Sequence, residues 1–91
     1  MIHKFQSKEQ ECLVILMEEC GELIQECSKM MRKNDFNSVD FGKEVGDVIA
    51  MLQVAHELGL YDEQRAVGCA AIKKAKLTKW SNLYDEEVVQ P

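Results

Sequence analysis

Two short acidic segments contain the side chains of this sequence that are best suited to chemistry. They are EECGE at residues 18–22 and EVGD at residues 44–47, and in both a Glu is followed three positions later by a second acid, with a Gly between them. On an α-helix, residues three apart point about 60° from each other on one face. Each segment therefore directs two carboxylates the same way. The four acids are Glu19, Glu22, Glu44 and Asp47.

The four carboxylates converge if their two helices pack antiparallel, as a short connection between helices favours. Like charges at close range repel, so converging carboxylates do not all remain ionised without a counter-ion. A divalent cation removes this repulsion, and an all-oxygen ligand set suits Mg²⁺, or Mn²⁺ in its place, rather than zinc. Because Mg²⁺ retains several waters and commonly bridges to substrate phosphates, the cluster predicts metal-assisted phosphate chemistry.

The alternative interpretation is that these acids merely occupy solvated helix faces. Both segments lie among apolar residues, however, and solvated faces seldom place acids at the centre of apolar stretches. The neighbouring apolar residues are Ile15, Leu16, Leu23 and Ile24 on the first helix and Val45, Val48, Ile49 and Leu52 on the second. This placement favours a shared site.

Three helical segments are predicted to position the acids. The first runs from the N-cap Ser7 to about Lys33, and the turn-forming sequence NDFNS at 34–38 separates it from the second. The second helix begins at Asn37 or Ser38 and ends at Leu58, with Gly59 in the left-handed position that follows many helices. The third runs from an N-cap at Asp62 to about Trp80, and residues 81–91 form a polar tail or an arm that packs on a partner.

The predicted fold is an all-α, antiparallel, four-helix-type bundle, formed by a single domain at residues 1–91 and completed by oligomerisation. A chain of this length buries only about 60% of its unfolded surface, so its own core is thin. The run CLVILM at 12–17 also makes the first helix apolar around its whole circumference, which is typical of a helix surrounded by others. Gly21 and Gly46 lie away from the acids, where a missing side chain lets another helix approach. The alternative is a monomeric bundle with one exposed apolar turn.

Composition excludes several classes of protein. Sixteen Asp and Glu against eleven Lys and Arg give a net charge of −5, which argues against binding polymeric nucleic acid. The longest apolar run, at 12–17, is too short to span a membrane. The N-terminus lacks the apolar stretch of a secretory signal, so a cytoplasmic protein is expected. Cys12, Cys20 and Cys27, spaced eight and seven apart, are expected to be small buried residues on one side of the first helix.

The two acidic segments together resemble the E-E-x-x-E … E-x-x-D signature of the MazG-like all-α nucleoside triphosphate pyrophosphohydrolases. The resemblance covers the first two helices closely and the third loosely. It implies a homodimer or homotetramer that uses Mg²⁺ to convert a nucleoside triphosphate into the monophosphate and pyrophosphate. It also implies that the metal ligands are Glu19, Glu22, Glu44 and Asp47, with Glu18 in the first position of the motif. Glu18 or Glu22 is the candidate catalytic residue that accepts the proton of the attacking water.

The third helix offers candidate phosphate-binding residues. Lys73, Lys76 and Lys79 recur every three residues along one flank and can meet the departing pyrophosphate. A solvated basic helix end is the equally plausible alternative. Trp80 can stack on a base or anchor packing. The base itself is expected near Gln10 and Ile15 and a neighbouring chain.

Two other functions remain open at this point. The related phosphoribosyl-ATP pyrophosphohydrolases have a similar double motif, but they usually place a His soon after the second Asp, whereas here the first is His56. His56 lies on the opposite side of its helix from Asp47, so it is expected to be a packed or interface residue rather than a metal ligand. The other alternative is a non-catalytic helical interaction module whose acids are structural.

Overall fold

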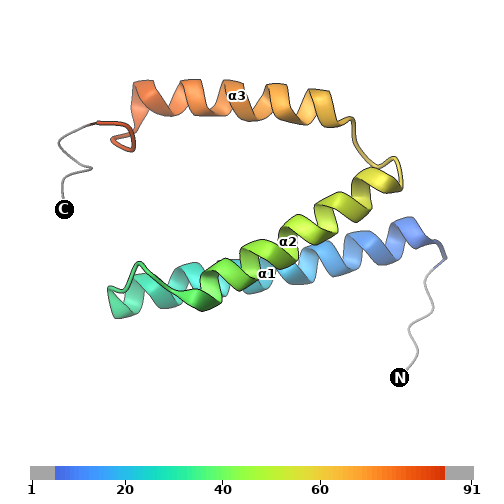
Figure 1. Cartoon of the computed structure of the whole chain (residues 1–91), viewed down its shortest axis with the longest axis horizontal. Helices are drawn as coiled ribbons and strands as arrows, with labels where there is room; N and C mark the ends of the chain where they lie inside the picture. The colour runs from blue at the N-terminus through green and yellow to red at the C-terminus, as the bar shows by residue number, and fades with distance from the viewer. Residues whose placement is uncertain (1–5, 86–91) are drawn as a thin grey trace. The chain divides into compact units, whose positions relative to one another are not determined.

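The computed structural model describes residues 6–85, and that part of the chain contains three α-helices and no strand. Helix α1 spans Lys8–Lys33, α2 spans Val39–Glu57 and α3 spans Glu63–Trp80 (Figure 1). The all-α prediction is therefore confirmed, and each helix lies within a residue or two of its predicted bounds.

The side chains that begin the helices are those predicted. Ser7, Ser38 and Asp62 each accept a hydrogen bond from the backbone N–H three residues further on, at 3.1, 3.3 and 3.1 Å. These bonds satisfy backbone donors that have no partner within the helix. At the start of α1, Gln10 Oε1 also accepts a hydrogen bond from the backbone N–H of Gln6 at 2.8 Å.

Two left-handed residues end the first two helices. Asn34 has φ 51° and follows α1, where its N–H donates to the carbonyl of Met31 at 3.3 Å. Gly59 has φ 76° one residue after the C-cap Leu58, which confirms its predicted place. Glycine lacks the Cβ that disfavours this conformation, so the chain turns there without strain. Because α1 stops at Asn34 and Ser38 caps α2, only residues 34–38 connect the two helices.

The chain divides into two compact units, Met1–Leu60 and Tyr61–Pro91. In the first, α1 and α2 run antiparallel and pack against each other (Figure 1). The second contains α3, which has no buried residue, and a turn in which the N–H of Asp85 donates to the carbonyl of Asn82 at 3.1 Å. The predicted tail at 81–91 lies in this unit, and its residues 86–91 lie outside the described part of the chain.

The hydrophobic core of the described residues is very small. Only Cys12 and Ala55 are buried apolar residues, each 3% exposed, and they lie on facing helices. Glu26 is the one buried charged residue in this region, and its carboxylate pairs with Lys29 Nζ at 3.0 Å. The hydrogen bond with Glu26, followed by the attraction of its charge, raises the pKa of Lys29. This thin core agrees with the expectation from chain length.

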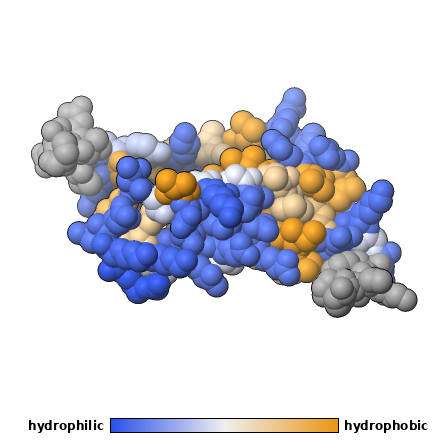
Figure 2. Space-filling model, turned by 60° about the horizontal axis from the view of Figure 1, so that its bottom comes forward, coloured by the Kyte–Doolittle hydropathy of each residue, from blue (hydrophilic) through white to orange (hydrophobic). Residues whose placement is uncertain are grey.

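A stripe of exposed apolar residues follows α1 from one end to the other. Successive members are alternately four and three residues apart, the spacing of a coiled-coil seam. They are Leu13, Met17, Cys20, Ile24, Cys27 and Met31, hereafter the α1 seam. Met17, Ile24 and Met31 are 65%, 69% and 75% exposed. Hydrophobic groups are similarly open to solvent beside polar surface in the space-filling view (Figure 2). The cysteine prediction is thus wrong at two positions, since Cys12 is buried but Cys20 and Cys27 are exposed.

Gly21 and Gly46, the glycines of the two acidic segments, are not close-approach points within the first unit. A Cβ added at Gly21 or Gly46 would meet no atom of another segment within 4 Å. Within the first unit, the close packing expected at these positions is therefore not made between α1 and α2. Within the described residues, no helix has both the length and the apolar character that crossing a membrane requires.

Candidate metal centre

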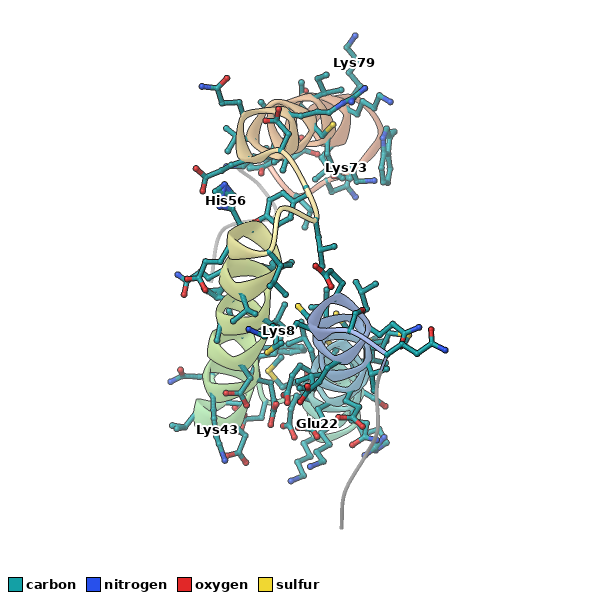
Figure 3. The ribbon with its side chains drawn as sticks, turned by 90° about the vertical axis from the view of Figure 1, so that its right-hand side faces the viewer. Lys8, Glu22, Lys43, His56, Lys73 and Lys79 are labelled. Carbon is teal, nitrogen blue, oxygen red and sulfur yellow. The ribbon has the colours of Figure 1, made fainter. Side chains whose placement is uncertain are left out.

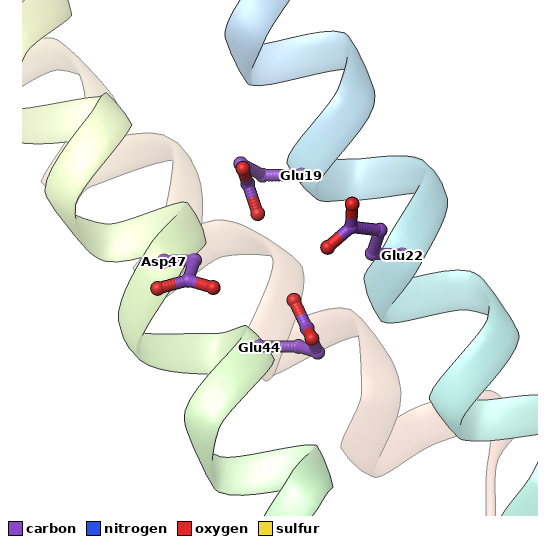
Figure 4. Close-up of side chains that lie close together, drawn as sticks. All are labelled: Glu19, Glu22, Glu44 and Asp47. Carbon is purple, nitrogen blue, oxygen red and sulfur yellow. The ribbon is translucent and has the colours of Figure 1, made fainter.

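Four carboxylates from two helices meet at one point between α1 and α2. One oxygen from each of Glu19, Glu22, Glu44 and Asp47 lies within 4.8 Å of the corresponding oxygens of the other three. The side chains point toward one another across the gap between the helices (Figure 4). The convergence predicted from the two acidic segments is confirmed.

The register of the helical hairpin produces this meeting. Glu19 and Glu22 lie near the middle of α1, and the turn at 34–38 sends the chain back so that Glu44 and Asp47 reach the same level. Within each pair the residues are three apart and so share a face. The caps at Ser38 and Asn34 fix where one helix ends and the next begins, and with that they fix which turns of α1 and α2 are adjacent.

Two oxygens of the cluster are buried and unpaired. Glu19 Oε1 and Glu44 Oε1 are shielded from solvent and have no hydrogen-bond partner in the described structure. Such groups are normally satisfied in proteins, because an unpaired buried carboxylate oxygen raises the free energy of the folded state. A cation between the helices would provide the partner that these two oxygens lack.

The electrostatics of the cluster lead to the same conclusion. Desolvation raises the pKa of Glu19, and the charges of neighbouring carboxylates, Glu22 foremost, raise it further. Desolvation also raises the pKa of Glu44, and the charge of Glu22 raises it further. Protons are thus held more tightly than by ordinary carboxyl groups, as expected where like charges are forced together.

The residues present fit a hard divalent cation. The donor set consists of carboxylate oxygens alone, with burial that decreases from the partly buried Glu19, Glu44 and Asp47 to the exposed Glu22. Oxygen ligands open to solvent on one side suit Mg²⁺ or Mn²⁺, which keep bound waters. No His or Cys belongs to the group, so the ligand set of a zinc site is absent from this cluster.

The remaining acidic and imidazole candidates lie outside the cluster. Glu18 is exposed and is not among the four grouped carboxylates, although its charge contributes to the raised pKa of Glu19. His56 lies toward the C-terminal end of α2, well away from Glu22 (Figure 3). This agrees with the expectation that His56 is not a ligand of the site.

The lysines predicted to bind phosphate lie on α3, in the second unit. Lys73, Lys76 and Lys79 are all exposed. Lys73 Nζ lies 5.3 Å from the centre of the Trp80 ring, within the range of a cation–π contact. Trp80 is itself 65% exposed, so it is not a packing anchor within its own unit. A phosphate-binding role for these lysines stays a prediction.

One feature of the first unit was not predicted from the sequence. A cavity of about 450 Å³ opens between the start of α1 and the end of α2, lined in part by Ile15, Met51 and Val54. Sequence reasoning named Ile15 but also Gln10, which does not line this cavity. It missed the contribution of α2, because the pairing of Ile15 with Met51 depends on the register of the hairpin.

Comparisons with known proteins add no relative. No protein-family model matches the sequence, and no match was found among curated proteins or solved structures. The geometry of the site and the resemblance of its two motifs are therefore the grounds for assigning a function.

Proposed function

We propose that this protein is a divalent-metal-dependent nucleoside triphosphate pyrophosphohydrolase. The observation that carries the proposal is the carboxylate cluster, whose four ligand oxygens lie within 4.8 Å of one another and include two that are buried and unpaired. The resemblance of EECGE and EVGD to the MazG-like signature supplies the reaction class. A nucleoside triphosphate is the expected substrate, and the monophosphate and pyrophosphate are the expected products.

Mg²⁺ or Mn²⁺, when bound, supplies positive charge to the phosphate oxygens and acidifies a water molecule. Glu19, Glu44 and Asp47 are the partly buried acids that would hold it from two helices, together with one oxygen of the exposed Glu22. Glu22 is the exposed member of the cluster. We propose that its second oxygen accepts the proton of the water that attacks the α-phosphorus. Glu18 lies about 100° around α1 from Glu19 and can take that proton from the solvent side. The lysines of α3 are the proposed partners of the leaving pyrophosphate.

A second copy of the chain completes the helical bundle in this proposal. The α1 seam runs from Leu13 to Met31, eighteen residue steps or about 27 Å at 1.5 Å per step, and a two-fold axis would place it against itself. Association would cover apolar surface that the small core of one chain leaves exposed. The seam lies about 120° around α1 from the face that meets α2, so it does not overlap the cluster. A homodimer, or a tetramer formed from two dimers, is the expected state.

The exposed seam also favours a second candidate function, that of a helical interaction module without activity. In that case the carboxylates would bind a cation only to hold the hairpin together. Metal binding alone does not separate the two functions, because both permit it. Phosphoribosyl-ATP hydrolysis remains an alternative within the enzyme class.

The deciding experiment incubates the protein with Mg²⁺ and each common nucleoside triphosphate, together with phosphoribosyl-ATP, and resolves the products by chromatography. We expect monophosphate and pyrophosphate, lost in Glu22→Gln and Asp47→Asn. Glu57→Gln removes an acid from α2, the helix of Asp47, outside the cluster and should retain wild-type turnover. Diphosphate with inorganic phosphate, or no turnover of any substrate, would contradict the proposal.

Glu18→Gln separates the two candidate proton acceptors. If Glu18 accepts the proton, the variant loses turnover but binds Mg²⁺ as tightly as the wild type. If Glu22 does, Glu18→Gln retains most of its activity. Isothermal titration with Mn²⁺, measured beside turnover, distinguishes these results.

A further inference from the structure

The first unit contains a cavity that is lined by none of the four clustered carboxylates. It has a volume of about 450 Å³ and lies between the N-terminal turns of α1 and the C-terminal turns of α2. Its apolar wall is formed by Ile15, Met51, Val54 and Leu58, and Lys8 and Glu11 stand beside them. Figure 3 shows Lys8 between the two helices at this end of the hairpin. The cavity is thus an apolar recess with one cation and one carboxylate available to a ligand.

The recess has a defined floor. Cys12 is buried, and its Sγ donates to the carbonyl of Met51 at 3.9 Å, which links the two helices below the opening. Ala55 is buried on the facing helix. The two residues that make up the apolar core of the described chain therefore hold this end of the hairpin together, and the recess lies above a packed region rather than between loose helices.

The register places the recess next to the carboxylate cluster. Ile15 precedes Glu19 by four residues on α1, and Met51 follows Asp47 by four on α2. Because the helices are antiparallel, both steps lead in the same direction, about 6 Å or one helical turn along the hairpin. Residues four apart also lie on the same side of a helix. One continuous face of the hairpin therefore carries a metal-binding end and an apolar end.

We infer that this recess binds the nucleobase of the substrate. The inference rests on the proposed function and names the subsite that would distinguish a nucleotide from other polyphosphates. A nucleotide has the matching layout, since one pentose separates its flat, largely apolar base from the charged phosphates. Lys8 donates only and Glu11 accepts only, so together they can pair with an acceptor and a donor on the edge of a base. A polyphosphate or a sugar phosphate leaves the recess empty.

The experiment uses the methionine methyl groups as probes. The full-length protein is labelled with ¹³C at the methionine methyls and titrated with free nucleosides in EDTA, so that neither phosphate nor metal takes part. We expect the Met51 resonance to shift and saturate. Met17 and Met31 belong to the α1 seam and serve as internal controls whose resonances stay in place. No Met51 shift, or equal shifts of all three, would overturn the inference.

Variants that fill or widen the recess provide the second measurement. Val54→Trp should abolish the nucleoside-dependent shift of Met51, and Val67→Trp, the same exchange at an exposed position of α3, should leave it unchanged. Retention of the other methionine resonances shows that Val54→Trp is folded. If it is not, Ile15→Ala replaces it, with an expected loss of affinity of at least about threefold from the lost apolar contact. An unchanged Met51 titration in the folded variant would contradict the inference.

These results separate the recess from the reaction. If nucleosides shift the Met51 resonance but the protein turns over no substrate, the proposed function is wrong and the nucleoside site stands. Turnover with a normal KM in Val54→Trp would overturn the assignment of the recess to the base and leave the proposed function in place. A Met51 resonance that moves with protein concentration and not with nucleoside would assign the recess to a second copy of the chain, and so would overturn the inference.

Discussion

Replacing one ligand of the cluster should change stability in opposite directions with and without metal. Glu44 is the most informative position, because its Oε1 is buried without a partner and its pKa is raised by desolvation and by Glu22. In EDTA at pH 7.5, Glu44→Gln should raise the melting temperature. An amide is cheaper to desolvate than a carboxylate, and the repulsion from three neighbouring carboxylates is relieved.

In the presence of metal the order should reverse. A ligand that binds only the folded chain stabilises it by RT ln(1 + [L]/Kd), about 1.4 kcal/mol at ten times Kd. For a chain of this size about 1 kcal/mol moves the melting temperature by roughly 4–8 °C, so the wild type should gain roughly 6–11 °C. Glu44→Gln removes one of four ligand charges, so its affinity for the metal should be at least about tenfold lower. At the same metal concentration, the melting temperature of the variant should then rise by only roughly 2–3 °C.

The assay is thermal unfolding followed by circular dichroism, in EDTA and at several concentrations of Mg²⁺ and Mn²⁺. Glu57→Gln is the matched control, since it removes a carboxylate from the same helix but lies outside the cluster. Its metal-dependent shift should equal that of the wild type. A Glu44→Gln protein that is less stable in EDTA, or that gains as much from metal as the wild type, would refute the argument that these four carboxylates repel one another and share a cation.

Three further predictions address the rest of the chain. The pKa values of Glu19 and Glu44 are higher in the folded chain than in the unfolded chain. In EDTA, protonation of these two groups therefore stabilises the fold at low pH. This contribution is lost as the pH rises above the ordinary carboxyl pKa of 4.5. The melting temperature, measured from pH 4.5 upward, should fall in the wild type and fall much less in the Glu19→Gln/Glu44→Gln double variant. Equal slopes of melting temperature against pH in the two proteins would exclude this contribution of Glu19 and Glu44. Lys76→Gln should raise KM for the triphosphate several-fold at unchanged Mn²⁺ affinity if the lysines of α3 bind phosphate, whereas unchanged kinetics would leave them as a solvated helix face. Ile24→Glu places a charge in the α1 seam and should convert the oligomer to a monomer in sedimentation experiments; an unchanged sedimentation coefficient would exclude the seam as the interface.

Local sequence signals were sufficient to predict the helices. Ser7, Ser38 and Asp62 cap their helices through bonds to the N–H three residues away, and Gly59 takes the left-handed conformation assigned to it. Such signals depend only on neighbouring residues, so they can be recognised without knowledge of the fold. The pairing of acids within each helix is equally local, because a step of three residues fixes their common face.

Whether the two acidic pairs meet depends on tertiary structure. The turn at 34–38 brings Glu44 and Asp47 level with Glu19 and Glu22, and a shift of α2 by one turn would separate the pairs. The burial of the two unpaired oxygens likewise arises only when α1 and α2 pack together.

The same dependence explains what the sequence left undecided or assigned incorrectly. Cys20 and Cys27 share a side of α1 with each other, as their spacing requires, but that side does not face α2, and they are exposed. The recess beside the cluster needs Ile15 and Met51 to come together across the hairpin. The sequence by itself determined the helices, their ends and the carboxylate pairs on each, because these follow from contacts within a few residues. Only the tertiary structure decided which faces meet, because that depends on the packing and register of residues far apart in the chain.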